Sequence, residues 1–256
     1  MRIYTCVPEW EAMLTAIYTA FECKLGHNNL MLLTEPLEQM NLFDEYVHVD
    51  SDGEKAEKVA ESIKRKISPL FYHEMATTAM AYESDALDNI YHMLILGFAY
   101  GPSVLDMLKF KDVMRNREIR KRIGNEACRF KEAIRFHQIG NAYIAHIEPK
   151  SRIAEYLGPA FCDRMPSENF IIVDDIHMDA VIHEANKDFY IKKLTADELD
   201  QLIKTENMND QYTDLWKIFF ETIAIKEREN LKCQMNHSPL WARKHIVEFQ
   251  PLNRSL

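Results

Sequence analysis

The residues with the clearest chemical signal in this sequence are ten Lys and Arg side chains between Lys109 and Arg135. The same segment holds only four acids, so it carries +6, whereas the whole chain carries a formal charge of −9. A local excess of cations in an acidic chain is typical of a phosphate-binding surface, and the planar guanidinium of Arg donates two parallel hydrogen bonds to a phosphate. Six of these cations are the predicted nucleic-acid contacts: Arg115, Arg120, Arg122, Arg129, Lys131 and Arg135.

The same basic segment has a structural alternative, which is a solvated helix face whose cations pair with acids of the fold. Cations and aromatic residues alternate around Phe130 and Phe136, a pattern that suits single-stranded nucleic acid. We expect these two rings to lie in the core instead, which leaves Arg129 and Arg135 available to a ligand.

A second polar segment lies near the C-terminus, after an apolar stripe of helical spacing between Leu215 and Ile223. Arginine and amide side chains can contact phosphates or the edges of bases. A helix connection stabilised by local ion pairs is the structural alternative. The candidate contacts in this segment are Arg228, Asn230, Lys232 and Gln234.

Acidic and histidine side chains alternate between Asp174 and Asp179. On one strand, Asp175, His177 and Asp179 would share a face and could hold a divalent ion. Asp residues also form turns, so the segment could equally be the loop between two strands. We predict no metal site and no cofactor. If the protein is an enzyme acting on nucleic acid, its candidate catalytic residues are Asp174, Asp175 and His177.

Several classes of protein are disfavoured because their motifs are missing from the sequence. It contains no G-x-S-x-G, P-loop, G-x-G-x-x-G or H-E-x-x-H pattern. The five cysteines form no C-x-x-C pair, which argues against a zinc ribbon, an iron–sulfur cluster or a disulfide framework. With no charged-then-apolar leader pattern at its start, and an apolar run that is about half of a bilayer span, we expect a soluble cytoplasmic protein.

Helical patterns at both ends of the chain, with antiparallel strands between them, predict an α+β fold. We expect it to be mostly helical, with a central antiparallel sheet of about four to six strands. We expect a single domain over 1–256, with 51–123 as a candidate helical sub-domain. Capping boxes are predicted at Ser51–Glu54 and Thr195–Glu198. A helix that begins at Ser103 is expected to break at Gly124-Asn125. The predicted strands are 2–7, 46–49, 134–137, 142–147, 170–173, 180–183 and 189–191, with a hairpin turn at Gly140-Asn141.

One segment resembles the hallmark of a known bacterial family. Glu126-Ala127-Cys128-Arg129-Phe130-Lys131, followed by Ile134-Arg135-Phe136, is similar to the hallmark of a family labelled "probable DNA metabolism protein", a domain of unknown function. Weaker similarities follow one another in order along nearly the full chain: Tyr4-Thr5, Ile147-Glu148-Pro149, Phe161-Cys162-Asp163-Arg164, Phe170-Ile171-Ile172-Val173-Asp174, Leu215-Trp216, the segment 227–234, Pro239 and Trp241.

The resemblance implies a role in DNA repair or modification. Members of the family are typically encoded beside a radical S-adenosylmethionine (radical SAM) protein, and in some relatives the domain is fused to a uracil-DNA-glycosylase-like domain. We expect neither that module nor a radical-enzyme cluster motif in this chain. The resemblance therefore implies a DNA-binding accessory protein that works with a radical SAM partner. The alternatives are an enzyme acting on nucleic acid and a protein-interaction adaptor whose basic face binds an acidic partner.

Overall fold

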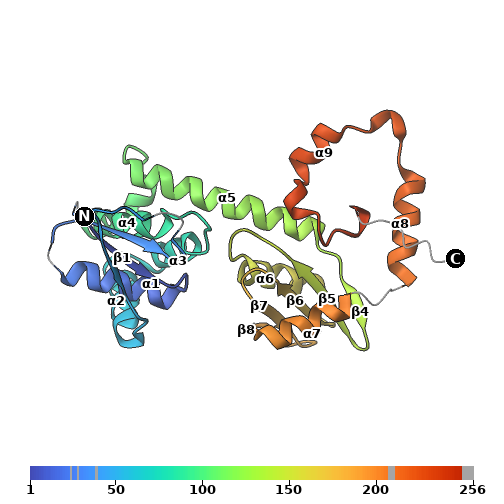
Figure 1. The fold of residues 1–256 in the computed structure, drawn as a ribbon, viewed down its shortest axis with the longest axis horizontal. Coiled ribbons are helices and arrows are strands. Elements are labelled where there is room, and N and C mark those ends of the chain that lie inside the picture. Colours follow the sequence, from blue (N-terminus) through green and yellow to red (C-terminus); the bar gives the residue numbers. More distant parts are fainter. Residues whose placement is uncertain (24, 28, 38–39, 207–210, 250–256) are drawn as a thin grey trace. The chain divides into compact units, whose positions relative to one another are not determined.

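The computed structural model describes residues 1–23, 25–27, 29–37, 40–206 and 211–249, and its elements are drawn in Figure 1. It divides into two compact units, Met1–Gly124 and Asn125–Leu256, which we describe separately. Helices predominate in the described residues and accompany two sheets, which confirms the predicted α+β class. The expectation of a single domain stays a prediction.

Unit 1 begins with a three-stranded parallel sheet in the order β2-β1-β3. The central strand β1 (Arg2–Cys6) is buried along most of its length, as expected for a parallel strand covered on both faces. Strands β1 and β3 (Glu45–His48) coincide with predicted strands, whereas β2 (Leu30–Thr34) was not among them. Helix α1 (Trp10–Glu22) connects β1 to β2, as the parallel pairing requires.

Three further helices complete the core of unit 1: α2 (Gly53–Lys66), α3 (Pro69–Thr78) and α4 (Ala86–Tyr100). The predicted capping box at the start of α2 is wrong. Asp52 caps this helix, because its side chain accepts from the backbone N–H groups of Glu54 and Lys55 at 3.1 and 3.2 Å. The Ser51 hydroxyl instead donates to Glu11.

Helix α5 (Lys111–Ala133) contains most of the basic segment. It follows a short 3₁₀ helix, η1 (Gly101–Asp106), so the predicted start at Ser103 is wrong. The predicted break at Gly124-Asn125 is also wrong. Buried residues lie on both sides of this point, at Ile123 and Ala127, so the packed side of the helix continues through it. A single glycine inside a helix costs only about 1 kcal/mol of stability.

Unit 2 is built on a five-stranded sheet in the order β4-β5-β6-β7-β8. All neighbouring strands are antiparallel except β5 and β6, which are parallel because helix α6 (Ala154–Arg164) connects them. The predicted strand at 134–137 is displaced, since α5 continues to Ala133. The strands are β4 (His137–Ile139), β5 (Ala142–Ile147), β6 (Asn169–Asp174), β7 (Asp179–His183) and β8 (Tyr190–Lys193).

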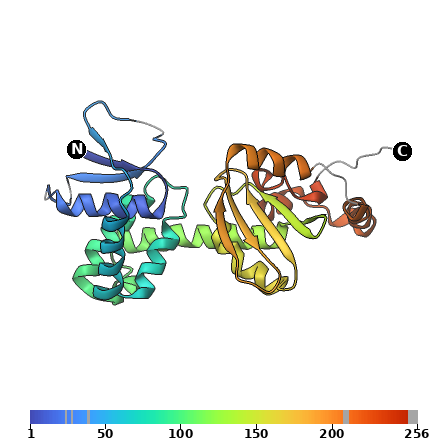
Figure 2. The ribbon, with the colours of Figure 1, turned by 90° about the horizontal axis from the view of Figure 1, so that it is seen from below.

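Helices cover both faces of this sheet, as Figure 2 shows for α6 and α7 (Ala196–Glu206). Phe161 of α6 packs against Phe170 with ring centroids 6.4 Å apart, whereas Leu199 of α7 packs against the buried cluster that contains Val173. Phe170 and Val173 point to opposite faces because side chains alternate along a strand. The predicted capping box at the start of α7 is confirmed: Thr195 N–H donates to Glu198 at 3.0 Å, and Glu198 N–H donates back at 3.3 Å.

The C-terminal part of unit 2 returns to the end of α5. Trp241 lies with its ring centroid 6.1 Å from that of Phe130, and Glu248 pairs with Arg135. These contacts place the segment from Trp241 to Glu248 beside the end of α5, and it shares a small pocket with His146 and Ile147 of β5. The elements of this part are α8 (Gln211–Ile223), η2 (Lys226–Arg228), α9 (Leu231–His237), η3 (Leu240–Ala242) and η4 (Val247–Phe249).

Candidate functional site

Histidine and carboxylate side chains meet at one edge of the sheet in unit 2. His146 and Glu148 lie at the C-terminal end of β5, and Asp175 directly follows β6. Because these two strands run parallel, their C-terminal ends share an edge, which is where ligands bind in many α/β sheets. His245, from the segment between η3 and η4, completes the group. We call these four residues the His–carboxylate cluster.

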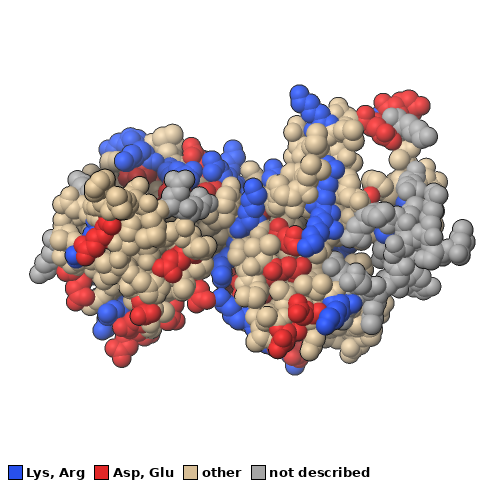
Figure 3. All heavy atoms as spheres, in the orientation of Figure 1, with Lys and Arg blue, Asp and Glu red and all other residues tan. Residues whose placement is uncertain are grey.

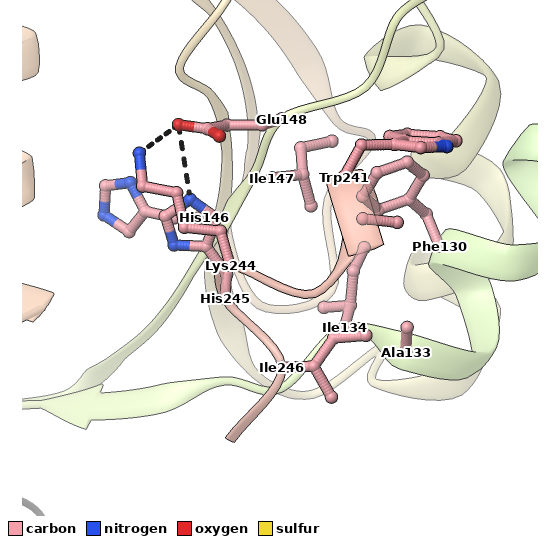
Figure 4. Close-up of a pocket in the computed structure, with 11 residues that line it drawn as sticks. Phe130, Ala133, Ile134, His146, Ile147, Glu148, Trp241, Lys244, His245 and Ile246 are labelled. Atoms are coloured by element: carbon pink, nitrogen blue, oxygen red, sulfur yellow. Dashed lines mark hydrogen bonds and ion pairs between the residues drawn. The ribbon is translucent and has the colours of Figure 1, made fainter. Parts of the chain in front are cut away.

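The geometry of the cluster is close and largely buried. His146 Nδ1 lies 2.8 Å from Asp175 Oδ1, and the exposed fractions of these side chains are 1% and 7%. His245 Nε2 lies 3.5 Å from Asp175 Oδ2 and 3.8 Å from Glu148 Oε1. The rings of His146 and His245 stack with centroids 5.9 Å apart. Figure 4 shows His146, Glu148 and His245 on one side of a small pocket, with Phe130, Ile134 and Trp241 on the other.

The second ring nitrogen of His146 faces no hydrogen-bond donor in the described part of the chain. Nδ1 donates to Asp175, so in the neutral ring the proton lies on Nδ1 and Nε2 carries a lone pair. That Nε2 is buried and has no hydrogen-bond partner among the described residues. Buried polar atoms are normally satisfied, so an unpaired acceptor beside a pocket is available to a ligand that donates a hydrogen bond. The arrangement is suited to accepting a proton or to binding an electrophile.

The predicted residues Asp174 and His177 do not face this cluster. Residues 175–178 form the turn between β6 and β7, so the arrangement on a single strand face does not occur. Asp174 is fully buried, and it accepts from the backbone N–H groups of Ile176 and His177 at 3.1 and 3.0 Å and from His177 Nδ1 at 2.7 Å. These bonds hold the turn, and only Asp175 of the predicted group belongs to the cluster.

Asp179, at the start of β7, has separate partners. It lies 3.4 Å from Arg152 and 3.9 Å from Lys193. Burial raises the pKa of the Asp179 carboxyl, and the two cations oppose that rise. Asp179 therefore forms a structural ion-pair group next to the cluster rather than part of it.

The three predicted arginines of unit 1 are already paired with acids from other parts of that unit. Arg115 donates to both carboxylate oxygens of Asp85 at 2.7 Å each. Arg120 pairs with Glu74 of α3, and Arg122 lies 3.1 Å from Glu83. On the face drawn in Figure 3, red acidic side chains accompany blue basic ones on both units. A phosphate would have to compete with these carboxylates for the three arginines.

The basic residues of unit 2 differ from one another. Arg135 Nη2 lies 2.6 Å from Glu248, and Lys131 Nζ lies over the ring of Tyr156 at 5.1 Å. Arg129 is exposed, and it has no hydrogen bond or ion pair with any part of the chain that the structure describes. Arg129 and Arg135 line a pocket of about 230 Å³, which we call the arginine pocket. The other residues lining it are Phe130, Glu132, Ala133, Phe220, His237, Ser238, Pro239, Ala242, Ile246, Glu248 and Phe249.

The aromatic residues of the basic segment lie as expected from the sequence. Phe130 is buried, and the ring of Phe136 packs edge-to-face against those of Phe161 and Phe170 at 5.4 and 5.9 Å. Neither ring is a free stacking surface. Arg129, next to Phe130, stays exposed as expected, whereas Arg135, next to Phe136, is paired with Glu248.

The second polar segment is distributed over η2 and α9. The Asn230 side chain accepts from the backbone N–H of Cys233 at 3.0 Å and so caps α9, a structural role. Arg228 and Lys232 are exposed, and Gln234 is half-buried. None of these four described residues lines the arginine pocket or the pocket beside the His–carboxylate cluster.

Three members of the cluster were not predicted from the sequence: His146, Glu148 and His245. Glu148 was part of the Ile147-Glu148-Pro149 similarity, but no metal-ligand or catalytic spacing connects it to the histidines. The group comes together only through the parallel pairing of β5 with β6 and the return of the C-terminal segment.

Comparison with protein families identifies the chain more broadly. A family model described as a domain of unknown function, DUF4130, matches residues 84–248, more than half of the chain. The chain belongs to the DUF4130 family. The His–carboxylate cluster and the arginine pocket lie within the matched region, apart from Phe249 at its end. No curated protein has a significant sequence match to this DUF4130 chain.

Across the ranges that the structure describes, no single helix is both long and apolar enough to cross a membrane. Residues Ala86–Asp106 and Lys111–Ala133 together satisfy the length and composition criteria, as a pair bent by 58°.

Proposed function

We propose that this DUF4130 protein is a nucleic-acid-binding accessory protein in DNA repair or modification, acting with a radical SAM partner. The observation that supports it is Arg129, which is exposed and without a carboxylate partner among the described residues, beside a pocket with aromatic walls. Cations that hold a backbone next to apolar or aromatic surfaces are the usual means of binding single strands.

The size of the arginine pocket supports an organic ligand. Its volume of about 230 Å³ is many times the roughly 10–15 Å³ that a cavity needs to hold one water. Phe220 and Phe249 contribute rings to its wall, and Arg135 contributes a second guanidinium. A nucleotide offers a flat base and an anionic phosphate to such a combination.

The family-like segment at 126–131 divides into a structural part and an exposed part. Glu126 is buried and accepts from the backbone N–H groups of Lys150 and Ser151 at 2.6 and 3.3 Å, so it holds the loop after β5. Arg129, three residues later, has no such structural bond. The resemblance of this segment to DNA-metabolism proteins supports the proposal, and so does the exposed guanidinium of Arg129 within it.

The paired arginines of unit 1 take a smaller part in this proposal. Arg115, Arg120 and Arg122 would lose a carboxylate partner for each phosphate gained. Arg129 is therefore the principal contact and Lys131 a further candidate, whereas Arg135 would have to give up its carboxylate partner Glu248. Arg228, Asn230, Lys232 and Gln234 remain candidates for a second contact.

DNA binding measured against salt concentration tests the proposal. The experiment uses the full chain with labelled single- and double-stranded DNA, followed by fluorescence anisotropy. Each phosphate contact releases counterions, so Arg129→Gln should weaken binding and lower the magnitude of the salt slope by about one. Lys187→Gln, which changes an exposed cation paired with Glu184 on the turn between β7 and β8, is the matched control. No measurable binding to either DNA at low salt, or equal effects of the two variants, would overturn the proposal.

The second candidate function is an enzyme acting on nucleic acid, and the His146–Asp175 pair favours it. A buried carboxylate that orients a histidine is a common arrangement for a general base. The pair replaces the predicted trio, because Asp174 and His177 are engaged in the turn. Labelled damaged DNA would be incubated with the protein and a divalent ion, with and without the radical SAM partner. Formation of a modified DNA product that is lost in His146→Gln, while DNA binding persists, would support an enzyme. Absence of such a product in every incubation would favour an adaptor.

A further inference from the structure

We propose that Glu148, Asp175 and His245 bind a divalent transition-metal ion, and that His146 orients one of these ligands. The carboxylate oxygens of Glu148 and Asp175 and a ring nitrogen of His245 all lie within 4.8 Å of one another. This inference concerns unit 2 alone and is independent of nucleic-acid binding.

The separations between these atoms fit a shared ion better than direct bonding. His245 Nε2 lies 3.5 Å from Asp175 Oδ2 and 3.8 Å from Glu148 Oε1, which is longer than a hydrogen bond of about 2.7–3.2 Å. Two ligand atoms that are each about 2.1 Å from a tetrahedral ion lie about 3.4 Å apart. Small movements of the three side chains would bring them to coordination distance.

His146 provides the second, independent observation. Its side chain is only 1% exposed, its Nε2 has no hydrogen-bond partner among the described residues, and it lines the same pocket as Glu148 and His245 (Figure 4). The pocket is about 10 Å³, close to the space that a single water or ion needs. A water molecule bound to the metal would donate to this Nε2 and remove the unsatisfied acceptor.

The bond from His146 to Asp175 has the form of an outer-shell contact at a metal site. His146 Nδ1 donates a hydrogen bond to Asp175 Oδ1, so the other carboxylate oxygen, Oδ2, is left facing His245. Ligating carboxylates are commonly held in this way by a hydrogen bond on the oxygen that faces away from the ion. We therefore assign His146 as a positioning residue.

The charge of the site also favours a cation. Two carboxylates, with exposed fractions of 7% and 22%, face one ammonium group, that of Lys244, which pairs with Glu148. The side chain of Lys244 is 63% exposed, so it can turn to solvent when an ion takes its place. Two largely buried carboxylates are stabilised far more by a coordinated divalent ion than by one exposed lysine.

The donor set selects the class of ion. Imidazole nitrogen with carboxylate oxygen suits Zn²⁺, Mn²⁺, Fe²⁺ or Co²⁺, whereas Mg²⁺ and Ca²⁺ prefer oxygen ligands alone. Three protein ligands leave a coordination position for water, as in catalytic zinc sites. Only Asp175 of this set belongs to the strand-face group that the sequence suggested, where we expected no metal.

Metal titration of the full chain tests the inference. The protein is stripped with a chelator and titrated with Zn²⁺ by calorimetry and with Co²⁺ by visible absorption, which reports nitrogen ligation. One ion per chain is expected, and Asp175→Asn and His245→Ala should each weaken binding at least tenfold. Glu184→Gln, an exposed acid of the same unit, is the matched control and should leave binding unchanged.

A conservative variant keeps the test decisive if the more buried substitutions prevent folding. Glu148→Gln alters a partly exposed side chain and should also weaken Zn²⁺ binding at least tenfold, while circular dichroism of the metal-free protein stays unchanged. His146→Gln should weaken binding less than loss of a ligand does. Absence of Zn²⁺ and Co²⁺ binding, or binding that Glu148→Gln leaves intact, would overturn the proposal whether or not the protein binds DNA.

Discussion

His146 Nδ1 and Asp175 Oδ1 lie 2.8 Å apart in a site where both side chains are almost fully buried. The bond joins the end of strand β5 to the turn that follows β6, next to the backbone bond from Asp175 N–H to Ile147 C=O at 3.0 Å. It fixes which nitrogen of His146 carries the proton and which carboxylate oxygen of Asp175 remains available. The chemistry that we assign to the cluster depends on both.

This pair should be strongly coupled in stability. A hydrogen bond to a charged group contributes about 1.5–3 kcal/mol, so His146→Ala and Asp175→Ala should each lower the free energy of unfolding by at least that amount. The double variant should be less destabilised than the sum, with a coupling energy of about 1–3 kcal/mol, measured by urea unfolding in the presence of a chelator. The exposed pair Lys187–Glu184 is the control and should show no measurable coupling. Additive effects at His146 and Asp175 would contradict the prediction.

The Asp85–Arg115 pair predicts a particular dependence on acid. The guanidinium of Arg115 donates to both oxygens and holds the pKa of Asp85 below its usual value. The unfolded chain therefore binds a proton at a higher pH than the folded protein does. The stabilisation is complete above the unfolded pKa of about 3.9, and it is lost as the pH falls through the folded value.

Two variants test this predicted dependence of the unfolding free energy on pH. Asp85→Asn and Arg115→Gln should each flatten the fall in unfolding free energy below about pH 4, because both remove the same linkage. At neutral pH each should cost less than about 1 kcal/mol, since half of the Asp85 side chain is exposed and the pair is screened by solvent. Urea unfolding over a range of pH measures both quantities. A steeper loss of stability in acid for Asp85→Asn than for the parent protein would show that the pKa of Asp85 is not lowered in the folded protein.

Local patterns predicted much of the fold, and competition between neighbouring residues explains where they failed. The Thr195–Glu198 capping box formed because no better cap stands beside it. At Ser51 the same pattern failed because Asp52, one residue later, reaches the same N–H groups. The strands at 170–173 and 180–183 were predicted correctly, since their apolar runs are bounded by turn residues.

The candidate site could be predicted only in part, because its geometry depends on contacts between distant segments. The sequence revealed the excess of cations in α5 but not that Asp85, Glu74 and Glu83 pack against three of them. It revealed Asp175 but not its partners, since His146 reaches it through the parallel pairing of β5 and β6. Pairing between strands and the return of a terminal segment leave no periodic pattern in the sequence.

Substitution by alanine at two helical glycines should change the free energy of unfolding in opposite directions. A Cβ at Gly97 in α4 would lie 2.7 Å from Ile67 Cδ1 and 3.0 Å from the ring of the fully buried Phe71. A Cβ at Gly124 in α5 would meet nothing within 4 Å. Alanine is favoured over glycine in a helix by about 1 kcal/mol, whereas overpacking a core costs about 1–3 kcal/mol.

Gly124→Ala should therefore raise the free energy of unfolding by about 0.5–1 kcal/mol, because the gain in helix propensity has no steric opposition. Gly97→Ala should lower it, since the crowding of Ile67 and Phe71 outweighs the same gain. Urea unfolding of the full chain compares the two variants with the parent protein. Each glycine is the control for the other, because both substitutions add one methyl group inside a helix. Destabilisation by Gly124→Ala would mean that α5 needs a flexible residue at this position, as the sequence alone suggested.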